Sequence, residues 1–454
     1  MRVIVKNIKE LKSQISFFVL LCIALILAGL LMVFLSGTKF SKPKELGYAG
    51  LSVVIPTGAQ WDSQQQWRYG NNSFYLTSTL RNPDGRPLGS VRFRYWLGAK
   101  KETSEELLAN KASELSGKIL DRDTIEKKGL SIQWINIKIP EITYEIYYGV
   151  GKLPGNHLLE IEAQRIDTAF KVDTIFENMV QNLRLDLKPP LQAGIDVIKQ
   201  MKSKGTRQLL DEFDSPSAFL IMDSQNNPLG FILEVFSEVQ TTKPYEYKAD
   251  VLYYLREPYR HRESALFYGN EEITEYVWKS ERNTYRNKTE FQTVLNKEGI
   301  ITLTRLSVPP VEKILQPSYS SIPEVFSDML VSYILASDFD KVNVEIIESN
   351  GKITPMNIVR TEPETTRPDF EEPAYALQIN FLDDSGLSQK IYFDENGKTI
   401  RELLDIPVRK RGFLSSSDSR ETLTFVRSKA EHLATQFPEQ SEQILQKIGQ
   451  AWVD

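Results

Sequence analysis

The chain has 454 residues, and its 41% hydrophobic and 25% charged residues are ordinary for a globular protein of roughly two or three domains. The single cysteine, Cys22, excludes an intrachain disulfide and a cysteine-based metal site. The three histidines, His157, His261 and His432, lie far apart in the sequence, which argues against a zinc site, and no serine stands in a nucleophile elbow.

An uncharged apolar segment near the N-terminus covers residues 15–35 and includes Ile15, Phe18, Leu25, Leu30 and Leu35. About 20 apolar residues span a bilayer as a helix, so the segment predicts a transmembrane anchor. A cleaved signal peptide has a shorter apolar region followed by small residues, whereas this segment ends at Leu35. We therefore expect an uncleaved signal-anchor.

The orientation of this anchor follows from the basic residues on its two sides. Residues 1–14 carry slightly more Lys and Arg than the flank after residue 35, which favours a cytoplasmic N-terminus. The sequence thus predicts a single-pass inner (cytoplasmic) membrane protein of a bacterial envelope, with its body in the periplasm or outside the cell. Because positive charge is concentrated before residue 46, the body is more acidic than the net charge of −5 indicates, and no nucleic-acid partner is expected.

Residues 46–187 predict one domain of strands and two helices. Val91 and Phe93 alternate with polar residues, which is the pattern of a half-buried strand. Thr103 and Glu106 form a capping box for a helix that ends near residue 116, and a second, amphipathic helix is expected at about 168–185. An antiparallel sheet with both helices on one face is the expected α+β arrangement.

Three features of this domain together resemble a known family. They are the start GLSVVIPTGAQW, the run of strands after it and the amphipathic end FENMVQNLRL. This pattern resembles the PsbP-like family of small extracytoplasmic α+β domains over residues 46–187. Members of that family are mostly non-enzymatic, so the resemblance implies a role in assembly or binding.

The prolines at 189 and 190 end this domain, and residues 191–213 are expected to form a helical linker. Residues 217–413 predict a long antiparallel meander with one helix that begins near Pro323. This order of elements resembles the lipoprotein-carrier family (LolA/LolB-like), which implies a curved sheet that holds acyl chains. A serine-rich linker at 415–419 and a helical tail over 420–454 are expected to complete the chain.

The stretch YFDENGKTIREL, residues 392–403, contains fragments of a nucleotide-binding loop and of a calcium loop. A phosphate-binding loop requires a glycine where Tyr392 stands. A calcium loop requires an acidic residue at the same position and a glutamate where Leu403 stands. Asn396 and Gly397 are instead a strong hairpin signal, so the stretch predicts a tight turn between two strands.

Arginines and aromatic residues are concentrated in the middle of the second domain. The candidate ligand strip consists of Arg256, Arg260, Arg262, Trp278, Arg282 and Arg286. These residues could bind an anionic lipid headgroup, a glycan or an acidic protein. Alternatively, the arginine stems cover aromatic rings on a hydrated sheet face, and neighbouring glutamates offset the charge.

The sequence therefore predicts an α+β protein in which a single transmembrane helix precedes two antiparallel-sheet domains, each with helices on one face, and a helical C-terminal tail. We expect a non-enzymatic scaffold or interaction subunit of an envelope complex, bound to the bilayer through its N-terminal helix and to a protein partner. The alternative function is a carrier of a lipid or other apolar ligand in the concave face of the second domain. Hydrolysis by scattered carboxylates is a third hypothesis, and no catalytic residue, cofactor or metal is expected.

Overall fold

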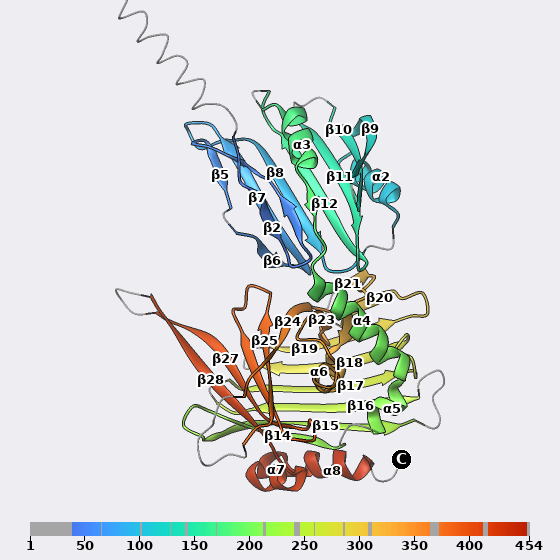
Figure 1. Ribbon diagram of the computed structural model, residues 1–454, viewed down its shortest axis with the longest axis vertical. Helices are drawn as coiled ribbons and strands as arrows, with labels where there is room; N and C mark the ends of the chain where they lie inside the picture. Colours follow the sequence, from blue (N-terminus) through green and yellow to red (C-terminus); the bar gives the residue numbers. More distant parts are fainter. Residues whose placement is uncertain are drawn as a thin grey trace, which may run out of the picture.

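The computed structural model describes residues 39–451 except 65, 100–101, 128, 141–143, 169, 212–214, 240–245, 258, 285–286, 307–310, 364–371 and 412–415. Of the residues that the structure describes, strands make up 51% and helices 20%. The prediction of an α+β fold is therefore wrong. The protein is mostly β, because two large sheets form its body and the short helices only cover parts of them (Figure 1).

The predicted transmembrane anchor, residues 15–35 with Ile15, Phe18, Leu25, Leu30 and Leu35, lies outside the described residues, as does the predicted cytoplasmic tail at 1–14. Within residues 39–451, no helix combines the length and the apolar character needed to cross a membrane. The prediction of a signal-anchored, single-pass inner-membrane protein with a periplasmic or extracellular body is not supported by this finding.

The first domain is built on an 8-stranded sheet in the order β5-β7-β8-β12-β11-β10-β9, with β6 paired to β7. Its strands are β5 (Trp61–Ser63), β6 (Arg68–Gly70), β7 (Ser73–Arg81), β8 (Pro87–Trp96), β9 (Lys118–Lys127), β10 (Leu130–Lys138), β11 (Glu145–Leu153) and β12 (His157–Arg165). Two smaller sheets accompany it. One has three strands, β2 (Lys44–Leu46), β3 (Leu51–Val53) and β13 (Arg184–Leu185), and the other has two, β1 (Lys39–Phe40) and β4 (Pro56–Thr57).

The two helices of the first domain, α2 (Ser104–Glu114) and α3 (Val172–Gln181), pack on opposite faces of this sheet. Ile135 of β10 contributes to the cluster beneath α2. The next residue toward the N-terminus, Trp134, contacts Phe176 of α3 with 5.7 Å between ring centroids. Because successive side chains of a strand point to opposite faces, the expected arrangement with both helices on one face is wrong.

Local signals in this domain are confirmed. The Thr103 hydroxyl accepts a hydrogen bond from the Glu106 backbone N–H at 3.2 Å, and the Glu106 carboxylate accepts one from the Thr103 N–H at 2.7 Å. This capping box supplies partners for two backbone N–H groups that a helix start leaves free. The alternating residues Val91 and Phe93 lie in β8 and are buried on the α3 side.

The second domain is a 15-stranded sheet in the order β21-β20-β19-β18-β17-β16-β15-β14-β28-β27-β26-β25-β24-β23-β22, antiparallel except for the last pair. Its strands are β14 (Ser217–Met222), β15 (Pro228–Glu238), β16 (Tyr247–Leu255), β17 (His261–Gly269), β18 (Tyr276–Thr284), β19 (Lys288–Leu295), β20 (Ile301–Arg305), β21 (Val311–Leu315), β22 (Ser321–Pro323), β23 (Lys341–Ile347), β24 (Ile353–Thr361), β25 (Tyr375–Phe381), β26 (Ser388–Phe393), β27 (Thr399–Arg411) and β28 (Ser416–Arg427).

This sheet curves around η1 (Glu324–Phe326) and α6 (Ser327–Ala336), while α7 (Ala430–Gln436), η2 (Pro438–Gln440) and α8 (Ser441–Ala451) cover its outer face (Figure 1). Phe326 packs edge-to-face on Phe267 of the inner face, with 5.4 Å between ring centroids. On the outer face, Phe231 contacts Phe437 at 5.1 Å. η1 and α6 therefore occupy part of the concave face.

The described part of the predicted linker, residues 191–211, packs against the second domain. Helix α4 (Pro189–Lys204) buries Leu191, Val197 and Met201 in the main core and lies against β23, and α5 (Thr206–Asp211) follows it. At the contact, a Cβ atom on Gly194 would lie 1.8 Å from the carbonyl oxygen of Asn343. Only a glycine allows this helix to approach the strand so closely.

The predicted helical tail begins instead with a strand. β28 contains residue 420 and pairs with both β14 and β27, so helical structure starts only at α7. A strand at this position fills the gap between the first and the last parts of the second domain. The tail prediction failed because the hydrophobic residues of 420–427 fit a helix as well as a strand.

The two domains meet at the buried carboxylate of Glu345, on β23. His157 of the first domain contacts Glu345 Oε1 through Nε2 at 2.7 Å, and both side chains are 0% exposed. Tyr48 donates its hydroxyl to the same oxygen. Ser318 and Ser321 donate to Oε2 at 2.6 and 2.8 Å. Burial alone would raise the pKa of Glu345, but His157 and these hydroxyl donors hold it below the usual value.

Candidate functional site

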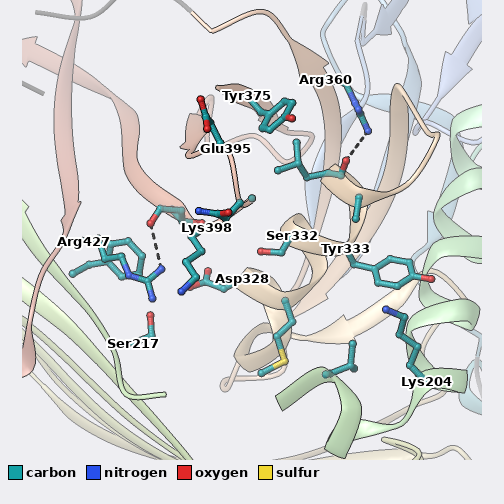
Figure 2. Close-up of a pocket in the computed structure, with 18 residues that line it drawn as sticks. Lys204, Ser217, Asp328, Ser332, Tyr333, Arg360, Tyr375, Glu395, Lys398 and Arg427 are labelled. Carbon is teal, nitrogen blue, oxygen red and sulfur yellow. Dashed lines mark hydrogen bonds between the residues drawn. The ribbon is translucent and has the colours of Figure 1, made fainter. Parts of the chain in front are cut away.

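A cavity of about 510 Å³ opens in the second domain between α6, the turn that joins β26 to β27, and the ends of β14 and β28 (Figure 2). Its described wall also includes the C-terminal end of α4 and part of β24. These elements are distant in the sequence, so the cavity exists only because the 15-stranded sheet curves around α6.

One wall of the cavity is the turn at residues 394–398, which contains the predicted hairpin residues Asn396 and Gly397. Asp394 Oδ1 accepts hydrogen bonds from the backbone N–H groups of Asn396 and Lys398, both at 2.8 Å. Gly397 has a φ of +76°, a conformation that glycine adopts without strain. The predicted hairpin turn is thus confirmed, and it places Lys398 at the cavity.

Four cationic side chains from four segments line the cavity: Lys204, Arg360, Lys398 and Arg427. Only two carboxylates, Asp328 and Glu395, are among the described lining residues. Figure 2 shows Lys398 extending toward Asp328 from the turn. The cations therefore outnumber the acidic groups, and the cavity favours an anionic occupant.

Arg360 is fixed in the wall by the C-terminal end of α6. Its Nη2 atom donates to the carbonyl oxygens of Leu335 at 3.0 Å and Ser337 at 2.7 Å, and more weakly to that of Ile334 at 3.3 Å. The last carbonyl groups of a helix lack partners within the helix and carry partial negative charge. Arg360 thereby caps α6 and remains rigid at the cavity.

Lys204 and Arg427 also make contacts within the cavity wall. The Lys204 ammonium lies 4.9 Å from the centroid of the Tyr333 ring. Arg427 donates from Nη1 to the carbonyl oxygen of Thr399 at 3.4 Å. These contacts hold the two side chains at the cavity.

Three interacting carboxyl groups lie at the cavity or behind its wall. Burial raises the pKa of Asp328 to about 6, although Arg427 opposes the shift. Burial and the charge of Asp328 raise the pKa of Glu402 to about 8, against a hydrogen bond from Gln389 Nε2 at 2.5 Å. Burial and the nearby carboxylates, Asp328 foremost, also raise the pKa of Glu234.

These carboxyl groups do not form an evident catalytic or metal site. Of the three, only Asp328 lines the cavity, whereas paired acid–base catalysis needs two groups within reach of one substrate. Across the described residues, no cluster of three or more His, Cys, Asp or Glu side chains is arranged to hold a metal ion.

We expect Glu402→Gln to make the protein's stability less dependent on pH. The pKa of Glu402 lies above its ordinary value of 4.5, so the folded state binds more protons and loses stability as pH rises from about 4.5 to about 8. The glutamine carries no charge and should raise the free energy of unfolding above pH 8 by roughly 1–4 kcal/mol. Urea unfolding across this pH range measures the effect, with the exposed Glu362→Gln as control. An unchanged pH profile would contradict the assignment.

The predicted arginine strip does not form one surface. Arg282 lies on the concave face, where its Nε donates to Glu263 at 2.8 Å, and Trp278 is buried in the core beside Phe267. Arg256 and Arg262 lie on the outer face, where they donate to Glu439 and Gln443 near α8. Arg260 pairs with Glu257, and Arg286 lies outside the described residues. The described arginines therefore have local carboxylate or amide partners on two faces.

The cavity residues were not identified as a site from the sequence. Lys204, Arg360 and Arg427 come from segments with no common motif, and only the turn at 394–398 was singled out. The sequence signal for that turn concerned backbone geometry, and it carried no information about the residues that would face it.

Comparisons with known proteins do not identify this chain. No protein-family model and no curated protein matches it. Among solved structures, a beta-barrel-like protein of the domain of unknown function DUF1849 from Brucella abortus is similar at 10% identity and a TM-score of 0.32, over 47% of this chain and 95% of that one. A Bacteroides thetaiotaomicron protein has 11% identity and a TM-score of 0.20, over 34% and 56% of the two chains. Similarities this weak support no conclusion about fold or function.

Proposed function

We propose that this chain is a non-enzymatic binding protein that takes a small organic anion into the cavity of its second domain. The observation that carries the proposal is the convergence of Lys204, Arg360, Lys398 and Arg427 on a cavity with only two lining carboxylates among the described residues. Guanidinium and ammonium groups form charge-assisted hydrogen bonds with carboxylate or phosphate oxygens.

The size and the lining of the cavity support a small ligand. Small-molecule sites typically enclose about 300–1,000 Å³, and this cavity of about 510 Å³ falls in that range. Tyr333, Tyr375 and Met329 add apolar surface for the carbon skeleton of an organic acid. A lipid carrier is less favoured, because η1 and α6 occupy part of the concave face that would hold acyl chains.

We expect Lys398→Met to weaken anion binding about tenfold, because a charge-assisted hydrogen bond contributes roughly 1.5–3 kcal/mol. Isothermal titration calorimetry with citrate, succinate and glycerol 3-phosphate measures the affinity. Lys341→Met, which removes an exposed lysine of β23 that is not among the described lining residues, is the matched control and should bind as the wild type does.

Other outcomes would point to a different function. If none of these anions binds, or if Lys398→Met binds them with wild-type affinity, the proposal is wrong. Lipid detected by mass spectrometry in the purified protein would favour the carrier hypothesis. Proteins that co-purify stably in the absence of any bound anion would favour the scaffold hypothesis.

A further inference from the structure

A second and larger cavity lies between the two domains. It has a volume of about 1360 Å³, and each domain supplies one wall. The first domain contributes residues 69–72, the end of β8 and the start of α2. The second domain contributes Phe291 of β19, Leu303 of β20 and the turn at 350–352. Ligand sites occur preferentially at such domain interfaces.

The walls of this interdomain cleft are held in place by direct bonds between the domains. Asn72 donates from Nδ2 to the Gly351 carbonyl at 3.0 Å and accepts from the Ile353 N–H at 2.9 Å. Ala99 and Gln316 exchange backbone hydrogen bonds of 2.9 and 3.0 Å. The cleft is therefore preformed, and a ligand would not have to bring the domains together.

Partly exposed aromatic rings form the apolar part of the cleft. Tyr69 and Trp96 come from the first domain, and Phe291 faces the cleft from the second. The Arg94 guanidinium lies 4.3 Å from the centroid of the Trp96 ring and thereby orients it. Flat rings on opposing walls suit a ligand with extended apolar faces.

Three polar groups in the cleft have hydrogen-bonding capacity. Arg94 donates from Nε to Ser73 Oγ at 3.0 Å, but its terminal nitrogens make no hydrogen bond to any residue that the structure describes. The side chains of Glu102 and Asn71 likewise have no described partner. The cleft thus presents donors at Arg94, acceptors at Glu102 and both at Asn71, which together match hydroxyl groups.

The balance of charged residues in the cleft differs from that in the cavity of the second domain. Arg94 and Lys352 are balanced by Glu102 and Glu106 among the described lining residues. Lys352 already contacts Asp383 at 2.8 Å, and Glu106 belongs to the capping box of α2. A charge-balanced cleft favours a neutral ligand, since an ion would meet like charge on one wall.

We propose that the interdomain cleft binds a neutral oligosaccharide. A sugar chain combines the three properties that the cleft requires: apolar ring faces for Trp96 and Phe291, hydroxyl groups that both donate and accept, and no net charge. The volume accommodates several linked sugar rings, whereas a single small molecule would leave much of the cleft hydrated.

Calorimetric titration of the full chain with maltohexaose, cellohexaose and chitohexaose tests this assignment. We expect at least one of them to bind and to change the tryptophan fluorescence. Glu102→Ala and Phe291→Ala should each weaken that binding about tenfold. The matched controls are Glu105→Ala, in the first turn of α2, and Leu306→Ala, at the exposed position that follows β20. Both variants should retain wild-type affinity.

The assignment would be overturned if no oligosaccharide bound at about 1 mM. It would also be overturned if Glu102→Ala and Phe291→Ala, shown to be folded by circular dichroism, bound as tightly as their controls. Competition separates this site from the anion cavity: saturating citrate should leave oligosaccharide binding unchanged, and displacement by citrate would count against a distinct site.

Discussion

Replacement of Glu345 by alanine is expected to lower the free energy of unfolding by about 3–5 kcal/mol. The carboxylate accepts hydrogen bonds from His157, Tyr48, Ser318 and Ser321 in a fully buried position between the domains. Removing it leaves these donors without their acceptor in a site that water does not reach, and each such group costs about 1–3 kcal/mol when the surroundings cannot rearrange.

Glu345→Gln should cost less than half as much, and the reason lies in the proton on His157. The His157 Nδ1 atom is 3.0 Å from the Pro154 carbonyl oxygen, which can only accept, so Nδ1 carries a hydrogen. In the variant, where no carboxylate faces Nε2, an imidazole with a hydrogen on Nδ1 alone presents a lone pair at Nε2, to which the glutamine amide can donate. The amide oxygen can still accept from Ser318 and Ser321.

Urea unfolding at neutral pH, followed by circular dichroism and by tryptophan fluorescence, measures both effects. Because His157 and Tyr48 belong to the first domain, loss of the carboxylate should also uncouple the domains and separate the two unfolding signals. Glu362→Ala, at an exposed position, is the control. An unfolding free energy of Glu345→Ala within about 1 kcal/mol of the wild type would show that the network contributes little.

Gly194→Ala is expected to destabilise the protein by about 1–3 kcal/mol, although alanine is the better helix former. The added Cβ would lie 1.8 Å from the Asn343 carbonyl oxygen, which belongs to the backbone of β23 and cannot move independently of the sheet. Helix α4 would have to shift away from the strand, and Leu191 and Val197 would lose part of their packing.

Gly449→Ala in α8 is the matched substitution with the opposite expected sign. A Cβ at position 449 would meet no atom within 4 Å, so only the gain in helix propensity remains, about 0.5–1 kcal/mol. Thermal unfolding of both variants measures the difference between a helical glycine that packing requires and one that it does not. Equal effects of the two substitutions would contradict the close contact between α4 and β23.

Features governed by neighbouring residues could be predicted from the sequence. The Thr103–Glu106 capping box and the Asn396–Gly397 turn depend on a few adjacent residues, and both are confirmed. Features governed by tertiary packing could not be predicted in this way. The apolar residues of β10 change from one face, with Ile132 and Trp134, to the other, with Ile135 and Ile137, but the sequence does not show which helix covers each face.

The two candidate sites illustrate the same limit. Lys204, Arg360, Lys398 and Arg427 are ordinary surface cations in the sequence, and they form a group only because the curved sheet brings their segments together. His157 was considered and set aside because no other histidine or cysteine is near it in the sequence. Its partner, Glu345, is almost two hundred residues away and was one of 60 acidic residues.

The order of strands in the second domain has a consequence for synthesis of the protein. β14 is the first strand of this sheet to be made, but one of its two neighbours, β28, is the last of its described strands. While the ribosome translates the segment between them, β14 has an open edge that could pair with other chains. Folding of this domain must therefore await the C-terminal segment, and we expect nascent chains that stop before residue 416 to depend on chaperones or to aggregate.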